Sequence, residues 1–193
     1  MKQDWQQWDD ATLHLNLWVT QGLILAIAAS CSLWLHGWSG TLDLFRVPEW
    51  TGIGWAALLA GAVILTSIAM DRYLPRKWQD DGNINERIFG SMSTAGIILV
   101  CAAIGIGEEW LFRGVIQPFA GNVWTSVIFT LVHTRYLRKP LLVASMFGTS
   151  WLLGFLFDLE QSLWPPILAH TAIDMVLALY LRYTITRGQG EEK

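Results

Sequence analysis

The chain has 193 residues, of which 53% are hydrophobic and 15% are charged, and its formal net charge is -3. Because soluble domains carry about 25% charged residues, this composition disfavours a soluble domain, and the small acidic net charge gives no reason to expect a nucleic-acid partner. The 12 tryptophans are typical of a protein that places aromatic rings at the membrane–water boundary.

Uncharged stretches of membrane-spanning length follow one another along the chain. A helix needs roughly 20 apolar residues to cross the hydrocarbon core of a bilayer. Five stretches without formal charge, and a sixth interrupted only by Asp174, approach or exceed this length: 11–42, 50–70, 88–107, 114–134, 140–157 and 161–181. We therefore predict an all-α, multi-pass membrane bundle of about six transmembrane helices, forming a single integral membrane domain over residues 1–193.

The basic residues predict an orientation. Lys and Arg concentrate in the 71–87 connection, at 135–139 and after residue 182, whereas the 158–165 connection has none and the 37–50 connection has only Arg46. Cytoplasmic loops carry an excess of Lys and Arg. An even number of crossings then places all three basic clusters, and both termini, on the cytoplasmic side.

The segment "GEEWLFRG" (107–114) places charges between two uncharged stretches, where they are costly unless they pair, face a cavity or react. Glu109 and Arg113 are four residues apart, so on a helix they share a face and can form an internal ion pair. Glu108 points about 100° away from Glu109 and escapes that pair. The role of proton acceptor and donor therefore fits Glu108 better than Glu109.

A second ionisable group lies at a matching depth on the next helix. Pro118, Gly121 and Asn122 predict a turn near residue 120. In an antiparallel hairpin around this turn, Glu108 and His133 both lie roughly 18 Å from it. This match predicts a shared site.

The third group is "HTAID" (170–174), in which His170 and Asp174 share one face of a helix that Pro165 and Pro166 begin. Asp174 can accept from a ring nitrogen of His170 and fix its tautomer. A simple model places His170 nearer the outer loop than His133, so a tilted or late-starting helix is needed to bring them together. His14 and His36, towards the ends of the first stretch, are predicted to be structural.

Three motifs now stand in order on separate predicted helices: "EEWLFR" fits EExxxR, "FTLVH" fits FxxxH and "HTAID" fits HxxxN/D. Together they resemble the CPBP family, which comprises CAAX prenyl proteases of type II, bacteriocin-processing enzymes and their bacterial relatives, also called the Abi family. The resemblance covers roughly residues 88–182, which would be the catalytic core.

The resemblance implies an intramembrane endopeptidase of the glutamate type that acts on a membrane-associated peptide or protein. Glu108 and His133 would activate a water, His170 and residue 174 would stabilise the oxyanion, and Glu109 with Arg113 would support the site. Asp174 departs from the Asn of the prenyl-protease branch, because an ionised Asp cannot donate to an oxyanion. It would have to be protonated, or orient His170 while that ring donates.

Several alternatives remain open from the sequence. Two His and one or two carboxylates suit Zn²⁺ as well, although HExxH is absent, so metal-free catalysis without a cofactor is favoured over a zinc site. A non-proteolytic scaffold or immunity-type protein would keep the fold and use the polar cluster for packing. A small transporter with a proton relay is less favoured, because no pair of broken helices recurs in the two halves. Only two predicted helices precede the motif-bearing four, which suggests a partner membrane protein.

Overall fold

A computed structural model describes residues 8–75, 78 and 83–191, and this part of the chain contains helices and no strands. The helices are α1 Asp10–Leu44, α2 Trp50–Tyr73, α3 Ile84–Ser91, α4 Thr94–Glu109, the π-helix η3 Trp110–Ile116, α5 Gln117–Val132, the 3-10 turn η4 Thr134–Tyr136, α6 Pro140–Glu160 and α7 Trp164–Glu191. The predicted all-α class is confirmed.

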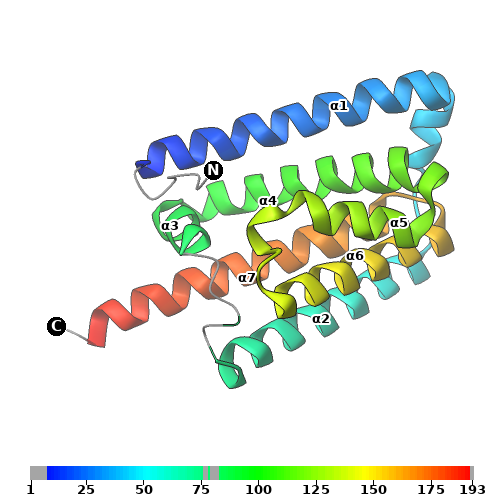
Figure 1. The fold of residues 1–193 in the computed structure, drawn as a ribbon. Coiled ribbons are helices and arrows are strands. Elements are labelled where there is room, and N and C mark those ends of the chain that lie inside the picture. Colours follow the sequence, from blue (N-terminus) through cyan, green and yellow to red (C-terminus); the bar gives the residue numbers. More distant parts are fainter. Residues whose placement is uncertain (1–7, 76–77, 79–82, 192–193) are drawn as a thin grey trace.

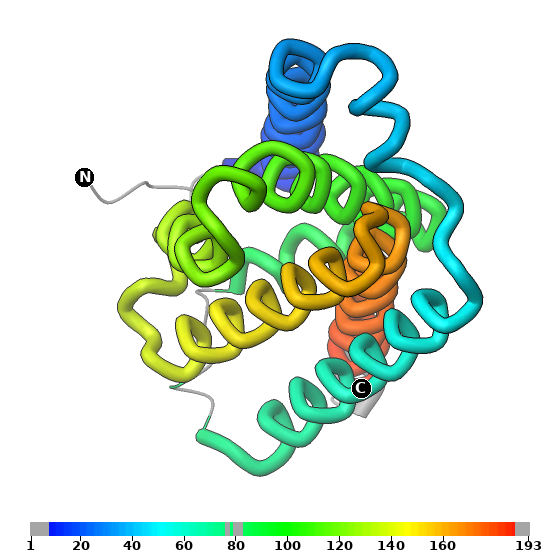
Figure 2. Tube along the Cα trace, turned by 90° about the vertical axis from the view of Figure 1, so that its right-hand side faces the viewer, coloured from blue at the N-terminus to red at the C-terminus, as the bar shows by residue number. Residues whose placement is uncertain are grey.

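The long helices form one bundle in which α7 packs against α2, α3, α4 and α6, while α1 packs along α4 and η3. Figure 1 shows that α1 begins and α7 ends at the same end of this bundle. Figure 2, viewed from the other end, shows the connections from α1 to α2, from η3 to α5 and from α6 to α7 nearest the viewer. The cytoplasmic location of the end shared by α1 and α7 stays a prediction from the basic residues.

Among the residues that the structure describes, five helical stretches are long and apolar enough to cross a membrane: Asp10–Leu44, Trp50–Tyr73, Thr94–Val132, Pro140–Glu160 and Trp164–Arg187. The predicted multi-pass bundle is therefore supported, with one difference of detail. Thr94–Val132 joins two predicted spans, because residues 114–120 prolong α4 through η3 instead of starting a new helix. The chain then reverses at Gly121 (φ 73°, ψ 162°), at the predicted turn, and α5 runs back beside α6 (Figure 1).

The returning part of α5 is too short to be a span of its own. Residues 122–132 extend roughly 16 Å at 1.5 Å per residue, about half of the hydrocarbon core. The helix ends at Val132, and His133 follows with φ -83° and ψ 54°. A short returning helix therefore carries His133 into the interior of the bundle.

Local sequence signals start several of these helices. Asp9 caps α1 by accepting from the backbone N–H of Thr12 at 2.8 Å, and the hydrogen bonds from Thr12 hold the pKa of the Asp9 carboxyl below its ordinary value. Ser93 caps α4 in the same way by accepting from Gly96 N–H at 3.0 Å. The first turn of α7 contains Pro165 and Pro166, as predicted. Proline has no backbone N–H, and this costs no helical hydrogen bond in the first turn.

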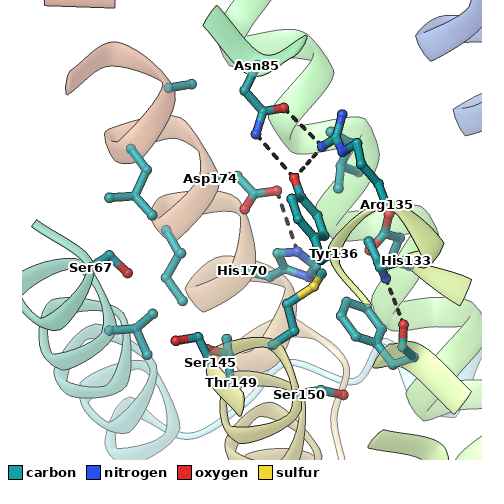
Figure 3. Close-up of a pocket in the computed structure, with 18 of the residues that line it drawn as sticks. Ser67, Asn85, His133, Arg135, Tyr136, Ser145, Thr149, Ser150, His170 and Asp174 are labelled. Carbon is teal, nitrogen blue, oxygen red and sulfur yellow. Dashed lines mark hydrogen bonds and ion pairs between the residues drawn. The ribbon is translucent and has the colours of Figure 1, made fainter. Parts of the chain in front are cut away.

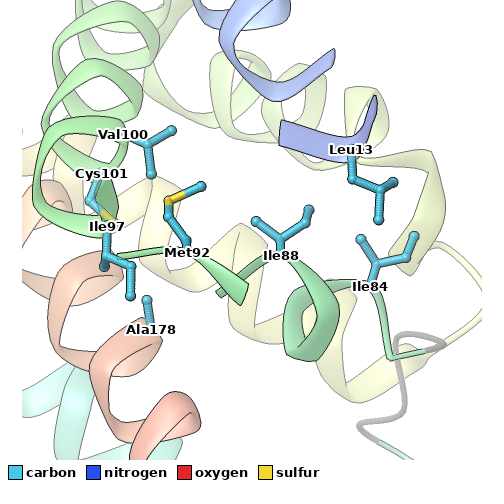
Figure 4. Packing of buried hydrophobic residues seen from close by; sticks show 8 residues of the cluster. All are labelled: Leu13, Ile84, Ile88, Met92, Ile97, Val100, Cys101 and Ala178. Atoms are coloured by element: carbon cyan, nitrogen blue, oxygen red, sulfur yellow. The ribbon is translucent and has the colours of Figure 1, made fainter. Parts of the chain in front are cut away.

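Apolar side chains fill the space between the helices in three clusters. Figure 4 shows the cluster that joins α3 to its neighbours: Leu13, Ile84, Ile88, Met92, Ile97, Val100, Cys101 and Ala178. A second cluster holds α2, α6 and α7 together around Leu153 and Ile173, and a third includes Phe157, Leu163 and Ile167. These clusters leave a cavity between them, and the polar residues of the motifs gather around it.

Helices α4 and α7 approach each other closely at Gly105. A Cβ atom there would overlap Thr171 Oγ1 and lie 3.1 Å from the Thr171 backbone nitrogen and 3.2 Å from the Ile167 carbonyl oxygen. Because two of these three neighbours are backbone atoms, the helices would have to move apart to admit a side chain. Gly105 therefore sets the separation of the two helices that carry the EExxxR and HxxxD motifs.

We predict that Gly105→Ala lowers the unfolding temperature in detergent, because overpacking against backbone costs about 1–3 kcal/mol and outweighs the gain of up to about 1 kcal/mol from replacing a helical glycine. Gly61→Ala in α2 is the matched control, since nothing lies within 4 Å of a Cβ at that position. A Gly105→Ala protein that unfolds at or above the native temperature would contradict this packing.

Candidate active site

A cavity of about 490 Å³ lies within the bundle, and Glu108, His133, His170 and Asp174 all line it. Figure 3 shows His170 and Asp174 entering from α7 and His133 from the end of α5, with Ser145, Thr149 and Ser150 of α6 along another wall. The structure thus brings together, around one space, the four residues for which the sequence predicts catalytic roles.

Glu108 and Glu109 are adjacent in the sequence but have different surroundings. Glu108 is 8% exposed and lines the cavity, and its carboxylate makes no hydrogen bond to any group that the structure describes. Glu109 is fully buried and does not line the cavity. The helical rotation between neighbouring residues separates the two carboxylates, as the sequence predicts.

Glu109 joins two of the motifs. Its Oε2 accepts from Arg113 Nε at 2.9 Å, which is the predicted pair four residues apart on one helix face. Its Oε1 accepts from His170 Nδ1 at 2.7 Å. One carboxylate therefore links the guanidinium of the first motif to the imidazole of the third, across the α4–α7 contact.

Arg113 is also fully buried, and each of its nitrogens has an acceptor. Besides Glu109, Nη2 donates to Ser150 Oγ at 2.9 Å and Nη1 lies 3.4 Å from Gln117 Oε1. Gln117 in turn donates to Asp158 Oδ1 at 2.7 Å. A buried charge needs partners on every side, and α5 and α6 supply those that the first motif lacks.

The sequence analysis missed Ser150, Gln117 and Asp158. Gln117 carried a usable signal, because it is a polar residue four positions after Arg113 within an uncharged stretch. Ser150 and Asp158 had none, since their role depends on how α6 packs against α5.

The π-helix passes through the first motif. In η3 the N–H of Gln117 donates to the Phe112 carbonyl, five residues earlier. Pro118 has no N–H to give to the carbonyl of Gly114, four residues earlier, and the His36 ring donates to that carbonyl from Nε2 at 2.8 Å. His36 therefore completes the backbone bonding of this segment, which is a structural role.

The other histidine of α1 is placed in a similar way. His14 Nε2 lies 3.0 Å from the Ile88 carbonyl oxygen, which ties α1 to α3. Neither His14 nor His36 lines the cavity.

His133 occupies the C-terminal end of α5. Its Nδ1 donates to the Phe129 carbonyl at 2.7 Å, a last-turn carbonyl that the helix no longer satisfies. In a neutral imidazole, donation through Nδ1 leaves Nε2 as an acceptor. The centroid of the Phe129 ring lies 4.6 Å from that of the His133 ring and 6.3 Å from that of the His170 ring, so Phe129 packs near both imidazoles.

Asp174 is related to His170 differently from the prediction. Its Oδ2 lies 3.5 Å from His170 Nε2, a long separation for a hydrogen bond, whereas Glu109 lies 2.7 Å from the opposite nitrogen. Glu109 therefore makes the short bond that the sequence assigns to Asp174. The sequence also predicts that His170 and His133 lie at different depths in the membrane. In the structure His133 follows the end of α5, both histidines line the same cavity, and Phe129 packs near both imidazoles.

One end of the cavity is lined by polar residues that the sequence did not single out. Asn85 of α3 donates to the Tyr136 hydroxyl at 3.2 Å, and Arg135 donates to Asn85 Oδ1 at 3.2 Å and to the same hydroxyl. Figure 3 shows these three side chains meeting beside Asp174 and His133. The short helix α3 was not predicted as an element, so its contribution to this wall was missed.

The sequence leaves a zinc site open as the alternative to metal-free catalysis. Within residues 8–75, 78 and 83–191, no three His, Cys, Asp or Glu side chains are arranged so that they could hold one metal ion. Glu109 is engaged by Arg113 and His170. The preference for metal-free catalysis stays a prediction from the sequence.

We predict that Arg113→Met strongly destabilises the protein, because it leaves the Glu109 carboxylate buried without its counter-charge, a change that costs about 3–5 kcal/mol. Thermal unfolding in detergent measures the effect. Arg46→Met is the control, since Arg46 is exposed and donates to the Glu160 carbonyl oxygen at the rim of the bundle. Equal unfolding temperatures for the two variants would show that the buried pair does not hold the bundle together.

Comparison with known proteins identifies a family. Residues 90–176 match the family described as "Type II CAAX prenyl endopeptidase Rce1-like". Over 177 residues the chain is 36% identical to "Uncharacterized protein YpbD" of Bacillus subtilis (strain 168), an alignment that covers 91% of this chain and 93% of that relative. No solved structure matches the chain significantly. The matched segment contains all three motifs, and the chain belongs to the Rce1-like family of type II CAAX prenyl endopeptidases.

Proposed function

We propose that this protein is an intramembrane endopeptidase that hydrolyses a peptide bond of a membrane-associated substrate with a water activated by Glu108 and His133. One observation carries the proposal: the Glu108 carboxylate is buried, lines the cavity, and has no hydrogen-bond partner among the described residues. Burying such a group is costly. A reaction in which it takes up and releases a proton explains why it is there.

In the first step Glu108 takes one proton from a water. The resulting hydroxide oxygen bonds to the scissile carbonyl carbon, and the carbonyl electron pair moves onto its oxygen. His133 assists by accepting from the same water through Nε2, because Nδ1 is committed to the Phe129 carbonyl. Two acceptors on one water fix the direction of its attack.

The oxyanion needs a donor held in place before the reaction. In the proposed mechanism His170 is the imidazolium, with a proton on each ring nitrogen: Nδ1–H is engaged by Glu109 at 2.7 Å, and Nε2–H donates to the oxyanion. Asp174, 3.5 Å from Nε2, orients this nitrogen and does not itself donate. Glu109, held by Arg113, keeps the ring in one orientation.

The second step returns the proton. Glu108 gives it to the amide nitrogen of the tetrahedral intermediate, the oxyanion re-forms the carbonyl, and the C–N bond breaks. The products are a new carboxyl terminus and a new amino terminus, and Glu108 is again ionised. The proton therefore passes from the water to Glu108 and from Glu108 to the substrate nitrogen.

We predict that Glu108→Gln abolishes cleavage without unfolding the protein, because Gln keeps the size of Glu108 and cannot accept a proton from water. Membrane-protein termini are compared by mass spectrometry in cells that carry the native chain, Glu108→Gln, or the matched control Glu86→Gln, whose site is exposed on α3. New termini should appear with the native chain and Glu86→Gln and disappear with Glu108→Gln.

Identical termini in all three strains at equal expression, with a cellular phenotype that Glu108→Gln still rescues, would refute the protease and support a non-proteolytic scaffold with the same fold.

A further inference from the structure

Helix α1 carries a buried amide that the proposed mechanism does not use. Gln21 is 4% exposed and lines the cavity that also holds Glu108 and both imidazoles. Its Oε1 is enclosed and has no hydrogen-bond partner in the described part of the chain. An unpaired buried amide destabilises a fold, so its presence in a native structure calls for a functional explanation.

Two other fully enclosed polar atoms have no hydrogen-bond partner in the described structure, but their locations differ. Trp110 Nε1 and Thr171 Oγ1 are also without hydrogen bonds in the described structure. Neither residue lines the cavity, whereas Gln21 does. Gln21 is therefore the one of the three that a molecule in the cavity can reach.

Packing fixes Gln21 close to the proposed proton acceptor. Gly107, which directly precedes Glu108, lies against α1 so closely that a Cβ there would be 3.3 Å from Ile24 Cγ2 and 3.3 Å from Leu25 Cγ. Gln21 lies one turn before this contact on α1. The amide is thus held within about one turn of the level of Glu108.

The chemistry of the side chain matches that of a peptide group. A glutamine amide offers one carbonyl and one NH₂ group, which complement the N–H and C=O of a backbone peptide unit. A peptide that enters a cavity inside a membrane loses the water that served its backbone, so each polar group needs a protein partner. Because Gln21 lines the cavity, a rotation about its terminal side-chain bonds would present the amide to a peptide bound there.

We propose that Gln21 binds one backbone peptide group of the substrate, beside the bond that is cleaved. The inference rests on the proposed function and assigns part of substrate binding to α1, outside the segment 90–176 that matches the family. Because the contact is with the backbone, it is independent of the side chains of the substrate.

The test measures binding, so that the cleavage step does not enter. The probe is a fluorescein-labelled decapeptide of alternating alanine and leucine, and fluorescence anisotropy gives its Kd for the Glu108→Gln protein in detergent micelles. Adding Gln21→Met, which keeps the side-chain length and removes both hydrogen-bonding groups, should raise Kd about tenfold, the loss expected for one or two neutral hydrogen bonds.

Ester analogues of the decapeptide identify the contact. Each analogue replaces one backbone N–H by oxygen. One analogue should bind the Glu108→Gln protein more weakly than the decapeptide does. Its affinity should not fall further when Gln21→Met is added, because the ester and the substitution remove the same hydrogen bond. A purely structural role for Gln21 would not produce this pattern.

Thr171→Val is the matched control, because it removes another unpartnered polar atom away from the cavity. Both Gln21→Met and Thr171→Val should keep or raise the unfolding temperature, and only Gln21→Met should change Kd. Any of three results would overturn the inference. The Glu108→Gln protein does not bind the decapeptide, Gln21→Met leaves Kd unchanged, or every ester analogue loses further affinity when Gln21→Met is added. Binding through Gln21 without any Glu108-dependent cleavage in cells would instead refute the protease and leave the peptide site standing.

Discussion

The structure depends on one buried carboxylate that serves two partners. Glu109 accepts from Arg113 through one oxygen and from His170 through the other, with no exposure to solvent. A buried charge is tolerable only when its partners are fixed, and several features fix them. Gly105 lets α7 approach α4, and Ser150 on α6 accepts from the far side of the guanidinium. Breaking any of these contacts would leave an uncompensated charge in the bundle.

The same arrangement frees Glu108. Because Glu109 pairs with Arg113 and His170, its neighbour one residue earlier faces the cavity and has no hydrogen-bond partner among the residues that the structure describes. Under the proposed function, Glu109 holds the site together and Glu108 transfers the proton. His133 and His170 reach the same cavity from α5 and α7, and α1 adds an amide at nearly the same level. In this account four helices supply the groups that bind and cleave a peptide.

Much of this could be predicted from the sequence, for physical reasons. Hydropathy sets the helices, the spacing of Glu109 and Arg113 places them on one face, and Pro118 with Gly121 marks the reversal that brings His133 back beside Glu108. The partner of His170 could not be predicted. Either Glu109 or Asp174 could have accepted the hydrogen bond from His170. The short bond goes to Glu109 because α4 packs closely against α7, and residue spacing within one helix does not reveal such packing. The shortness of α5 and the wall formed by α3 escaped prediction for the same reason, since both depend on packing between segments distant in sequence.

The most direct test of the central claim is ¹⁵N NMR of the histidine rings in the purified protein, which contains four histidines. If Glu109 holds His170 through Nδ1, then Glu109→Gln will shift the His170 ring signals and leave those of His14 and His36 unchanged, and Asp174→Asn will have the smaller effect. His170 signals that ignore Glu109→Gln and move with Asp174→Asn would contradict the account, because Asp174 would then be the residue that fixes the ring.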